Sequence, residues 1–450
     1  MDTIKNENYD VVIIGSGLGG LTAATFLSRN GFKTLVVESL SRVGGRFSTI
    51  EHEGFKLPTG AILIPDGWVT KFFKEMDIDF NLLRPLSRVY YRIEGIEYEI
   101  PTDMGILKVL GVIDELEREK AKSGRKTKSV GVRGIARGYY KKMKAIKQEE
   151  IITVRDWLLQ YTENEKIHEV FDNLCAGLMM AHSWELPVSK FFLFQEMTNF
   201  FVAINGNLSI VKELVKIIEK NGAVWTSCPA RKILIKEGKA SGIIVEKDGQ
   251  QIEIQSKFVI SDIGPRMTVE LAGLGNFDEE YLKNMRVKLR PSPAIMLLVA
   301  SDKPLCLKGT HDALQIIMGG RRIRTVVPIS NVCPEVAPPG QHLFYTSAEL
   351  QSCTIPNDLK YEIDLIKRDL KDLFPDFEQH GRILKIRACT ILSRWPEGRT
   401  WLGYGLPLET TIPNLFNVGD GCVAPGLIGT TGSVESGYRV VELIENLLKD

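Results

Sequence analysis

Three glycines near the start of the chain have the spacing with which a backbone turn binds phosphate. In the segment VVIIGSGLGG, Gly15, Gly17 and Gly20 follow the pattern G-x-G-x-x-G. The first glycine permits a tight turn, the second lets backbone amides approach a pyrophosphate, and the third allows a helix to pack closely on a strand. The chemistry expected here is the binding of a dinucleotide, with further candidate ligands in the same turn at Ser16, Leu18 and Gly19.

An acidic residue follows at the distance that such a site requires. Glu38 lies 18 residues beyond Gly20. A carboxylate at this position can accept hydrogen bonds from ribose hydroxyls, and it would repel a 2′-phosphate. Together with the neighbouring Ser39, this acid predicts a nucleotide whose ribose carries no extra phosphate.

The elements that must position these residues form a β-α-β unit. Residues 9–14 and 34–37 are apolar and β-branched, which predicts strands, and residues 18–29 between them have helical character. Further along, residues 223–264 contain short β-branched runs separated by turn signals. We expect that stretch to be a small antiparallel meander that returns to the main sheet.

Three more features favour FAD over NAD. Gly44, Gly45 and Arg46 follow the acid, so the backbone can run beside the nucleotide while the guanidinium meets a phosphate oxygen. Near the C-terminus, Gly419 and Asp420 end a predicted strand, where the acid can bond the polyol chain of an extended cofactor. A glycine-rich turn at 426–433 then opens the last predicted helix, whose positive end would stabilise a reduced flavin.

The composition is that of a folded protein without a strong overall charge. The 450 residues are 44% hydrophobic and 25% charged, with a net charge of +1, so no global field attracts nucleic acid. The seven cysteines are scattered without a C-x-x-C pair, as expected of reduced thiols in a cytoplasm. The polar N-terminus and the absence of a long apolar run predict neither a signal peptide nor a spanning helix. We therefore expect a cytoplasmic protein.

Two stretches outside these motifs bear on the substrate. Twelve lysines and arginines lie between Arg118 and Lys147. This stretch is either a solvated loop or a surface that rests on anionic lipid headgroups, which would make the protein peripherally membrane-associated. Five phenylalanines lie between Pro187 and Ile204, and they either pack a core helix or line a tunnel for an apolar chain.

The order of these motifs resembles that of the phytoene desaturase branch of the flavin amine oxidase superfamily. The resemblance rests on the opening glycines, on RVGGR at 42–46, on the Gly206–Leu208 element before a helix, on the meander that ends in ISDIGP, and on the final glycine-rich helix. It implies an α/β fold, with a Rossmann-like FAD-binding domain of the glutathione-reductase type and a discontinuous, inserted α+β substrate domain. The implied FAD-binding domain comprises 1–80, 205–290 and 385–450, and the implied substrate or cap domain comprises 81–204 and 291–384.

By the same resemblance, further residues would contact the cofactor. Backbone near Ala230 would meet the adenine, and residues near Gly60 and Gly432 would lie beside the flavin. Additional candidate ligands are Ala61, Gly429, Ser433 and Val434. Four residues either shape the site or fill the domain junction: Arg394, Trp395, Trp401 and Tyr404. The chain departs from the family pattern at 57–60, where relatives carry an acid before the glycine, and at 204–207.

The implied activity is hydride transfer between FAD and an isoprenoid, polyene or other lipophilic substrate, by desaturation, saturation or isomerisation. The sequence assigns no catalytic side chain, and its histidines and acids lack the spacing of a hydrolytic or metal site. Two alternatives stay open. One is a flavin amine oxidase that acts on a soluble amine, and the other is a flavin-binding protein without turnover.

Overall fold

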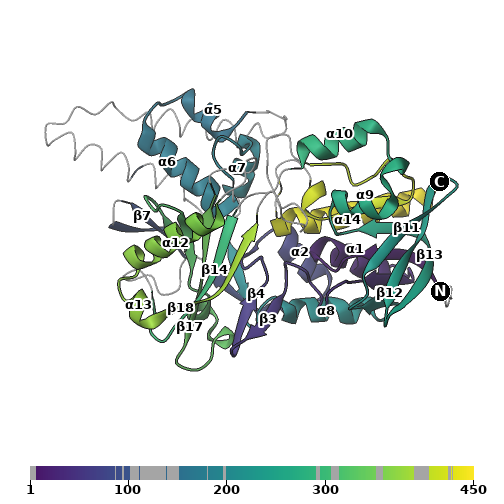
Figure 1. Ribbon diagram of the computed structural model, residues 1–450, viewed down its shortest axis with the longest axis horizontal. Coiled ribbons are helices and arrows are strands. Elements are labelled where there is room, and N and C mark those ends of the chain that lie inside the picture. Colours follow the sequence, from purple (N-terminus) through teal and green to yellow (C-terminus); the bar gives the residue numbers. More distant parts are fainter. Residues whose placement is uncertain are drawn as a thin grey trace.

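The chain folds into two halves, each built around a seven-stranded sheet, as the computed structural model in Figure 1 shows. Both chain ends lie at the outer end of the first half. The structure describes residues 7–86, 88–93, 96–101, 111, 138, 152–179, 181–195, 199–289, 294–305, 314–350, 358–389, 405–423, 427 and 429–449.

The first sheet contains the predicted β-α-β unit. Its strands are β1 (Glu7–Ile14), β2 (Thr34–Val37), β10 (Gly222–Trp225), β11 (Ala230–Lys236), β12 (Lys239–Lys247), β13 (Gln250–Ser261) and β19 (Leu415–Asn417). The order is β10-β2-β1-β13-β12-β11, and β19 also pairs with β13. Strands β10, β2, β1, β13 and β19 run parallel. Strands β11, β12 and β13 form the antiparallel meander predicted within 223–264, but residues 223–225 instead belong to β10, which pairs parallel with β2 at the edge of the sheet. The sheet confirms the expected α/β architecture.

Helices cover the first sheet, and the first of them is buried along most of its length. The helices of this half are α1 (Leu18–Arg29), α2 (Trp68–Glu75), α8 (Leu208–Ile218), α9 (Pro265–Ala272), α10 (Glu279–Lys288) and α14 (Gly429–Leu447), with short 3-10 turns at Leu274–Asn276 and Asp420–Cys422. Helix α1 packs against both α8 and α14. A Cβ atom on Gly437 would lie 2.7 Å from Thr22 Cβ, so this glycine lets the last helix lie close to the first.

The second sheet is mainly antiparallel and has a different hydrophobic cluster on each face. Its strands are β7 (Arg88–Ile93), β8 (Ile96–Pro101), β14 (Ala294–Ser301), β15 (Leu314–Ile317), β16 (Ile323–Val327), β17 (His342–Glu349) and β18 (Gly381–Cys389), in the order β18-β14-β17-β16-β15-β7-β8. Along β14, Ile295 and Leu297 belong to one cluster, whereas Leu298 and Ala300 belong to the other. This alternation is what a strand buried on both faces requires.

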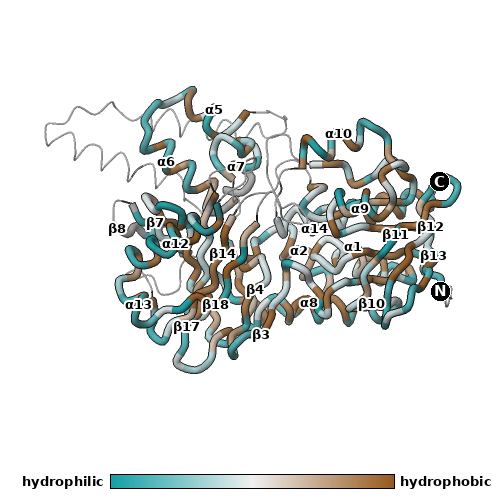
Figure 2. Tube along the Cα trace, in the orientation of Figure 1, coloured by the Kyte–Doolittle hydropathy of each residue, from teal (hydrophilic) through white to brown (hydrophobic). Residues whose placement is uncertain are grey.

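Helices cover both faces of the second sheet. One face packs against α12 (Leu359–Leu373) and α13 (Phe377–His380), and the other cluster includes residues of α5 (Val154–Leu159), α6 (Glu165–Leu174), a π-helical segment (Cys175–Met179) and α7 (Val188–Gln195). Short elements complete this half at α11 (Ile329–Val332), Phe80–Leu82 and Pro334–Val336. In Figure 2 the strands of both sheets are coloured largely as hydrophobic, whereas hydrophobic and hydrophilic residues alternate along the helices.

Two small sheets lie between the halves. One is the hairpin of β3 (Thr49–His52) and β4 (Phe55–Pro58), and the other has the order β5-β9-β6, formed by β5 (Ile64–Pro65), β9 (Phe200–Ala203) and β6 (Leu83–Leu86). Leu57 is buried in the core of the second half, whereas Ile64 is buried in that of the first. The segment from Leu57 to Ile64 therefore connects the two cores directly.

The phenylalanine stretch contributes to packing at its described positions. Phe200 is buried in the core of the second half, and Phe201 packs against the core of the first. Phe191 of α7 is fully buried, with its ring centroid 5.4 Å from that of Phe171. This residue fits the core-helix interpretation rather than the tunnel. The side chains of Phe192 and Phe194 lie outside the described part of the structure, as do nearly all residues of the basic stretch at 118–147.

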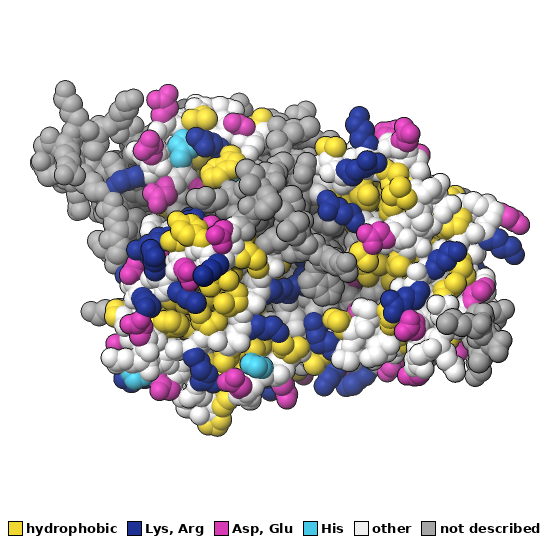
Figure 3. Space-filling model, viewed as in Figure 1, with side chains coloured by type: hydrophobic (Ala, Val, Ile, Leu, Met, Phe, Trp, Pro, Cys, Tyr) yellow, Lys and Arg dark blue, Asp and Glu magenta, His cyan; other side chains and the backbone are white. Residues whose placement is uncertain are grey.

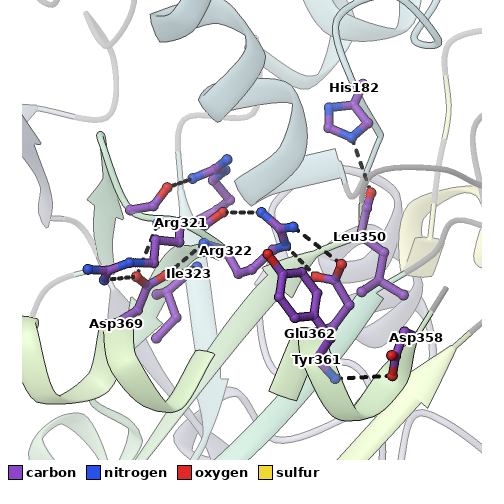
Figure 4. Close-up of polar contacts among 11 residues, drawn as sticks. His182, Arg321, Arg322, Ile323, Leu350, Asp358, Tyr361, Glu362 and Asp369 are labelled. Carbon is purple, nitrogen blue, oxygen red and sulfur yellow. Dashed lines mark hydrogen bonds and ion pairs between the residues drawn. The ribbon is translucent and has the colours of Figure 1, made fainter. Parts of the chain in front are cut away.

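An ion-pair cluster holds α12 against the turn between β15 and β16 (Figure 4). Asp369 accepts hydrogen bonds from the backbone amides of Arg321, Arg322 and Ile323 at 3.1, 2.6 and 3.0 Å. The guanidinium of Arg322 pairs with the buried carboxylate of Glu362. One carboxylate of α12 thus accepts hydrogen bonds from three consecutive backbone amides at this turn.

None of the helices in the described ranges combines the length and the apolar character needed to cross a lipid bilayer.

Candidate dinucleotide-binding site

The predicted glycine-rich turn connects β1 to α1. Gly15 has a φ of +95°, a left-handed conformation that favours glycine. A Cβ atom on Gly20 would lie 2.8 Å from the Gly15 carbonyl oxygen, so the third glycine lets the helix pack onto the strand. Gly17 is the N-cap of α1 and has no side chain to cap the helix. The helix therefore begins with amides and a positive dipole end that can face an anion.

Glu38 lies at the end of β2, where it is 5% exposed and braces the turn. Its Oε2 accepts hydrogen bonds from Ser16 N–H at 3.0 Å and from Ser16 Oγ at 2.6 Å. Its Oε1 accepts from Leu40 N–H at 2.9 Å and from Ser39 Oγ at 3.2 Å. Each carboxylate oxygen has two lone pairs, so these four donors occupy all four acceptor sites. A ribose hydroxyl would therefore take the place of one of them.

The second predicted segment, RVGGR, lies directly against the glycine-rich turn. The Gly44 amide donates to the Ser16 carbonyl oxygen at 3.0 Å and to Ser16 Oγ at 3.1 Å. A Cβ atom on Gly45 would lie 3.4 Å from Gly17 Cα. Gly44 and Gly45 have φ values of +94° and +50°, so their backbone conformation favours glycine at both positions.

Gly60 and Ala61 lie beside Arg46. The Ala61 amide donates to the Arg46 carbonyl oxygen at 2.9 Å, and a Cβ atom on Gly60 would lie 2.8 Å from Arg46 Cβ. Asn207, from the Gly206–Leu208 element, donates through its side chain to the Ala61 carbonyl oxygen at 2.8 Å. Residues from two distant segments thus hold the loop that follows β4.

The C-terminal segment completes the cluster. Arg46 pairs with Asp420 at 3.0 Å, and the Asp420 side chain is 7% exposed. Ser433 donates to Asp420 Oδ1 at 2.9 Å. A Cβ atom on Gly19 would lie 2.9 Å from the Gly419 amide nitrogen. The structure therefore brings the C-terminal segment against two N-terminal segments that lie hundreds of residues earlier in the sequence.

The remaining predicted residues occupy different surroundings. Ala230 begins β11, two residues after Cys228, whose amide donates to the Glu38 carbonyl oxygen at 2.8 Å. Gly432 lies against Val423, since a Cβ atom there would be 2.4 Å from Val423 Cγ1. Gly429 begins α14, whereas Val434 is fully buried in the first core. Leu18 opens α1 and is 5% exposed.

Sequence reasoning did not single out Asp262, although it quoted the segment ISDIGP. Asp262 follows β13, and its carboxyl group lies beneath the glycine-rich turn: Cβ atoms on Gly17 and Gly419 would lie 2.4 and 2.7 Å from its Oδ2 and Oδ1. Burial raises the pKa of this carboxyl well above its usual value. The sequence does show a carboxylate at the end of a predicted strand. Its place beneath the glycine-rich turn, however, depends on the pairing of β13 with β1.

Some predicted residues lie outside the described part of the structure. These are Arg394, Trp395, Trp401 and Tyr404, together with most of the turn at 424–428. In Figure 3, basic side chains lie along the junction of the two halves on the face shown. Within the described residues, no three His, Cys, Asp or Glu side chains gather in a way that could hold a metal ion.

Comparisons with known proteins agree with this geometry. A family model described as an NAD(P)-binding Rossmann-like domain matches residues 13–76. An uncharacterized protein of Methanocaldococcus jannaschii is 26% identical and covers 97% of this chain and 99% of its own length. A prolycopene isomerase of an Oncidium hybrid is 22% identical over 92% of this chain and 80% of its own.

The retinol reductases are longer than the region that matches. All-trans-retinol 13,14-reductase of Macaca fascicularis is 26% identical over 69% of this chain, and the match spans 55% of that enzyme. Among solved structures, an oxidoreductase of Methanosarcina mazei superimposes with a TM-score of 0.81 at 25% identity, covering 96% of this chain and 100% of that one.

A putrescine oxidase superimposes with a TM-score of 0.72 at 15% identity, covering 98% of this chain and 100% of that one, which establishes the shared fold. The fold, the Rossmann-like unit and the relatives point to one assignment. The chain has the FAD-dependent oxidase fold, and its relatives and structural neighbours include oxidoreductases.

Proposed function

We propose that the chain binds FAD along the glycine-rich turn and transfers hydride to or from a lipophilic substrate of the isoprenoid or polyene class. The observation that carries this proposal is the meeting of the segments at 15–20, 44–61 and 419–434, joined by the Arg46–Asp420 pair at 3.0 Å. A mononucleotide-binding β-α-β unit uses the first segment alone, whereas an extended flavin dinucleotide can contact all three.

The residues present fit each part of FAD. The first amides of α1, which Gly17 leaves without a side-chain cap, would hold the pyrophosphate. Glu38 would accept from the ribose, and Asp420 would bond the polyol chain. The backbone near Ala230 lies on the side of Glu38 where the adenine would extend. The positive end of α14 would face the ring system and stabilise added negative charge.

FAD supplies the hydride donor or acceptor when bound. The part of this chain is to hold the cofactor, to orient a carbon–hydrogen bond against it and to keep water out. We propose that the second half does this as a substrate domain of residues 81–204 and 291–384, with the FAD-binding domain formed by the rest. The strand β18, at Gly381–Cys389, crosses the proposed boundary and pairs within the second sheet.

Support for a lipophilic substrate comes from the named relatives, which include retinol reductases and prolycopene isomerases. Such a substrate would be taken from a bilayer, so peripheral membrane contact is part of the proposal.

The direct test uses the flavin-loaded protein with retinoid and carotenoid substrates. We expect all-trans-retinol to reoxidise the chemically reduced protein, or a more saturated polyene to reduce the oxidised protein, under anaerobic conditions. The absorption of the flavin reports both directions, and chromatography identifies the product. Absence of any redox reaction across saturated and unsaturated isoprenoids would contradict the substrate class.

A second candidate is an amine oxidase, which the superposition with putrescine oxidase over 98% of this chain favours. This candidate predicts reduction of the bound flavin by putrescine and release of hydrogen peroxide on reoxidation in air. The lipophilic proposal predicts neither, so the same preparation separates the two.

A further inference from the structure

A carboxyl group lies beneath the glycine-rich turn with one oxygen unused. The Asp262 amide donates to the Ile14 carbonyl oxygen at 2.8 Å, which fixes this residue under the turn between β1 and α1. Asp262 as a whole is partly exposed, but its Oδ2 is buried and has no hydrogen-bond partner among the described residues. An unused buried carboxylate oxygen is costly unless it is protonated or meets a donor.

Glycines surround this carboxyl group. A Cβ atom on Gly17 would lie 2.4 Å from Oδ2, one on Gly20 would lie 3.0 Å from the same oxygen, and one on Gly19 would lie 3.1 Å from Oδ1. From the C-terminal segment, a Cβ atom on Gly419 would lie 2.7 Å from Oδ1. The carboxyl group therefore fills the space between the two backbone turns that would hold the cofactor.

The surroundings of Asp262 favour its neutral form. Burial is the main cause of its raised pKa; the Gly20 amide and Arg46 oppose the shift, and Asp420 and Glu38 add to it. Cys422 of the 3-10 turn also faces it. On α14, Glu435 pairs with Arg439, and the first turn of α1 carries no acid.

We propose that Asp262 is a ligand of the FAD pyrophosphate that acts as a neutral acid, donating its proton in a hydrogen bond from beneath the glycine-rich turn. This inference rests on the proposed binding of FAD. An ionised carboxylate at the same place would repel the pyrophosphate. Binding of FAD should therefore weaken as Asp262 loses its proton, and binding above that midpoint should take up a proton.

The test measures the dissociation constant of FAD for the full chain, stripped of flavin, between about pH 5 and about pH 9. We expect a constant value at low pH and a rise of up to about tenfold per pH unit above the midpoint of Asp262. Calorimetry in two buffers of different ionisation enthalpy should show proton uptake in the sloping range.

Three variants make the test specific. Asp262→Asn keeps a donor but cannot ionise, so its dissociation constant should stay within about threefold of the wild-type low-pH value and should not vary with pH. Asp262→Ala lacks the donor and should bind FAD more weakly at low pH, again without a pH dependence. Asp10→Asn makes the same change near the other end of β1 and should keep the wild-type profile.

Two results would overturn the inference while leaving FAD binding intact: a wild-type constant that does not vary with pH, or an Asp262→Asn profile with the wild-type slope. Strong FAD binding that Asp262→Asn abolishes at low pH would also contradict it, because the neutral amide should replace the neutral acid. A wild-type protein that binds no FAD at any pH would overturn the proposed function and this inference together.

Discussion

At the scale of single residues, Glu38 has two tasks that can be separated. Its carboxylate accepts hydrogen bonds from Ser16, Ser39 and Leu40, so it shapes the turn whether or not a nucleotide is present. Its proposed contact with ribose would add a preference for a free 2′-hydroxyl. The first task affects every ligand equally, whereas the second depends on the sugar.

ADP and 2′-deoxy-ADP distinguish these tasks. We expect the wild-type protein to bind ADP about tenfold more tightly than 2′-deoxy-ADP, the value of one hydrogen bond to a charged group. Glu38→Gln should reduce that preference because a neutral amide accepts more weakly. Titration calorimetry measures both ligands. Equal binding of the two nucleotides by the wild type would assign Glu38 to the turn alone.

Asp262 makes the stability of the flavin-free protein depend on pH. Its folded-state pKa is raised, so its contribution is most favourable below the unfolded pKa and is lost as pH rises through the folded pKa. Asp262→Asn should therefore stabilise the protein at about pH 8 by roughly 1–3 kcal/mol, the range for relieving an unsatisfied buried polar group. The gain should be smaller at about pH 5. Denaturant melts at both pH values measure it, and a gain that is equal at both would contradict the assignment.

At the scale of elements, α12 contacts the second sheet through three carboxylates, and Asp369 accepts the most hydrogen bonds of the three. Asp369 accepts from three consecutive backbone amides and from the Arg321 guanidinium at 3.0 Å. The helix also contributes Ile366 and Leu370 to the core on that face. The same helix is therefore held both by apolar side chains in the core and by hydrogen bonds from backbone amides to Asp369.

Asp369→Ala should destabilise the second half by about 3–5 kcal/mol, because it removes a buried carboxylate from its ion pair and leaves three backbone amides without their acceptor. Asp372→Ala is a matched control: it removes another carboxylate that pairs with Arg321, but this side chain is 63% exposed, so we expect a change of at most about 1 kcal/mol. Proteolysis of the folded protein and denaturant melts report both changes. Equal effects would show that the amide bonds contribute little.

The strand β18 carries a partly buried cation, Arg387, toward the first half. Arg387 pairs in register with Met296 on β14, and its Nη2 is buried without a hydrogen-bond partner among the described residues. Burial lowers the pKa of this guanidinium, and the positive charges of Arg46 and Arg42 lower it further. A cation in such surroundings is destabilising unless an anion or a carbonyl group joins it.

Arg387→Met should therefore raise the stability of the ligand-free protein by about 1–3 kcal/mol, since it removes an unsatisfied buried group and keeps most of the volume. Arg382→Met on the same strand is the control, because Arg382 is half-exposed and pairs with Glu53 at 3.0 Å. Thermal melts of the two variants measure the difference. A loss of stability in Arg387→Met would indicate that the guanidinium is already satisfied.

At the scale of the whole molecule, the candidate site exists only when the chain is folded from end to end. Helix α14 reaches α1 through Gly437, and Asp420 reaches Arg46. The chain between them forms the second half and also returns to the first sheet with β10 to β13. A ligand that contacts all three segments must therefore couple the two chain ends.

How much of this could be predicted depends on whether a feature is local. The unit of β1, α1 and β2 was predicted almost to the residue, because the glycine spacing and the apolar pattern are contained in one stretch. The meander was predicted from its turns. The Arg46–Asp420 pair was not predicted as a contact, since each residue was assigned to the cofactor on its own. Asp262 was missed because its position depends on the lateral pairing of β13 with β1, which no local pattern records.

The most direct test of the central claim is the absorption spectrum of the purified protein, with identification of the cofactor released on denaturation. We expect flavin bands at about one equivalent per chain and release of FAD from the wild type. Gly17→Val should lose them, because a Cβ atom there would lie 2.4 Å from Asp262 Oδ2. Gly275→Val should keep them, since nothing lies within 4 Å of a Cβ atom at that position. A folded wild-type protein that stays colourless after incubation with FAD would contradict the account.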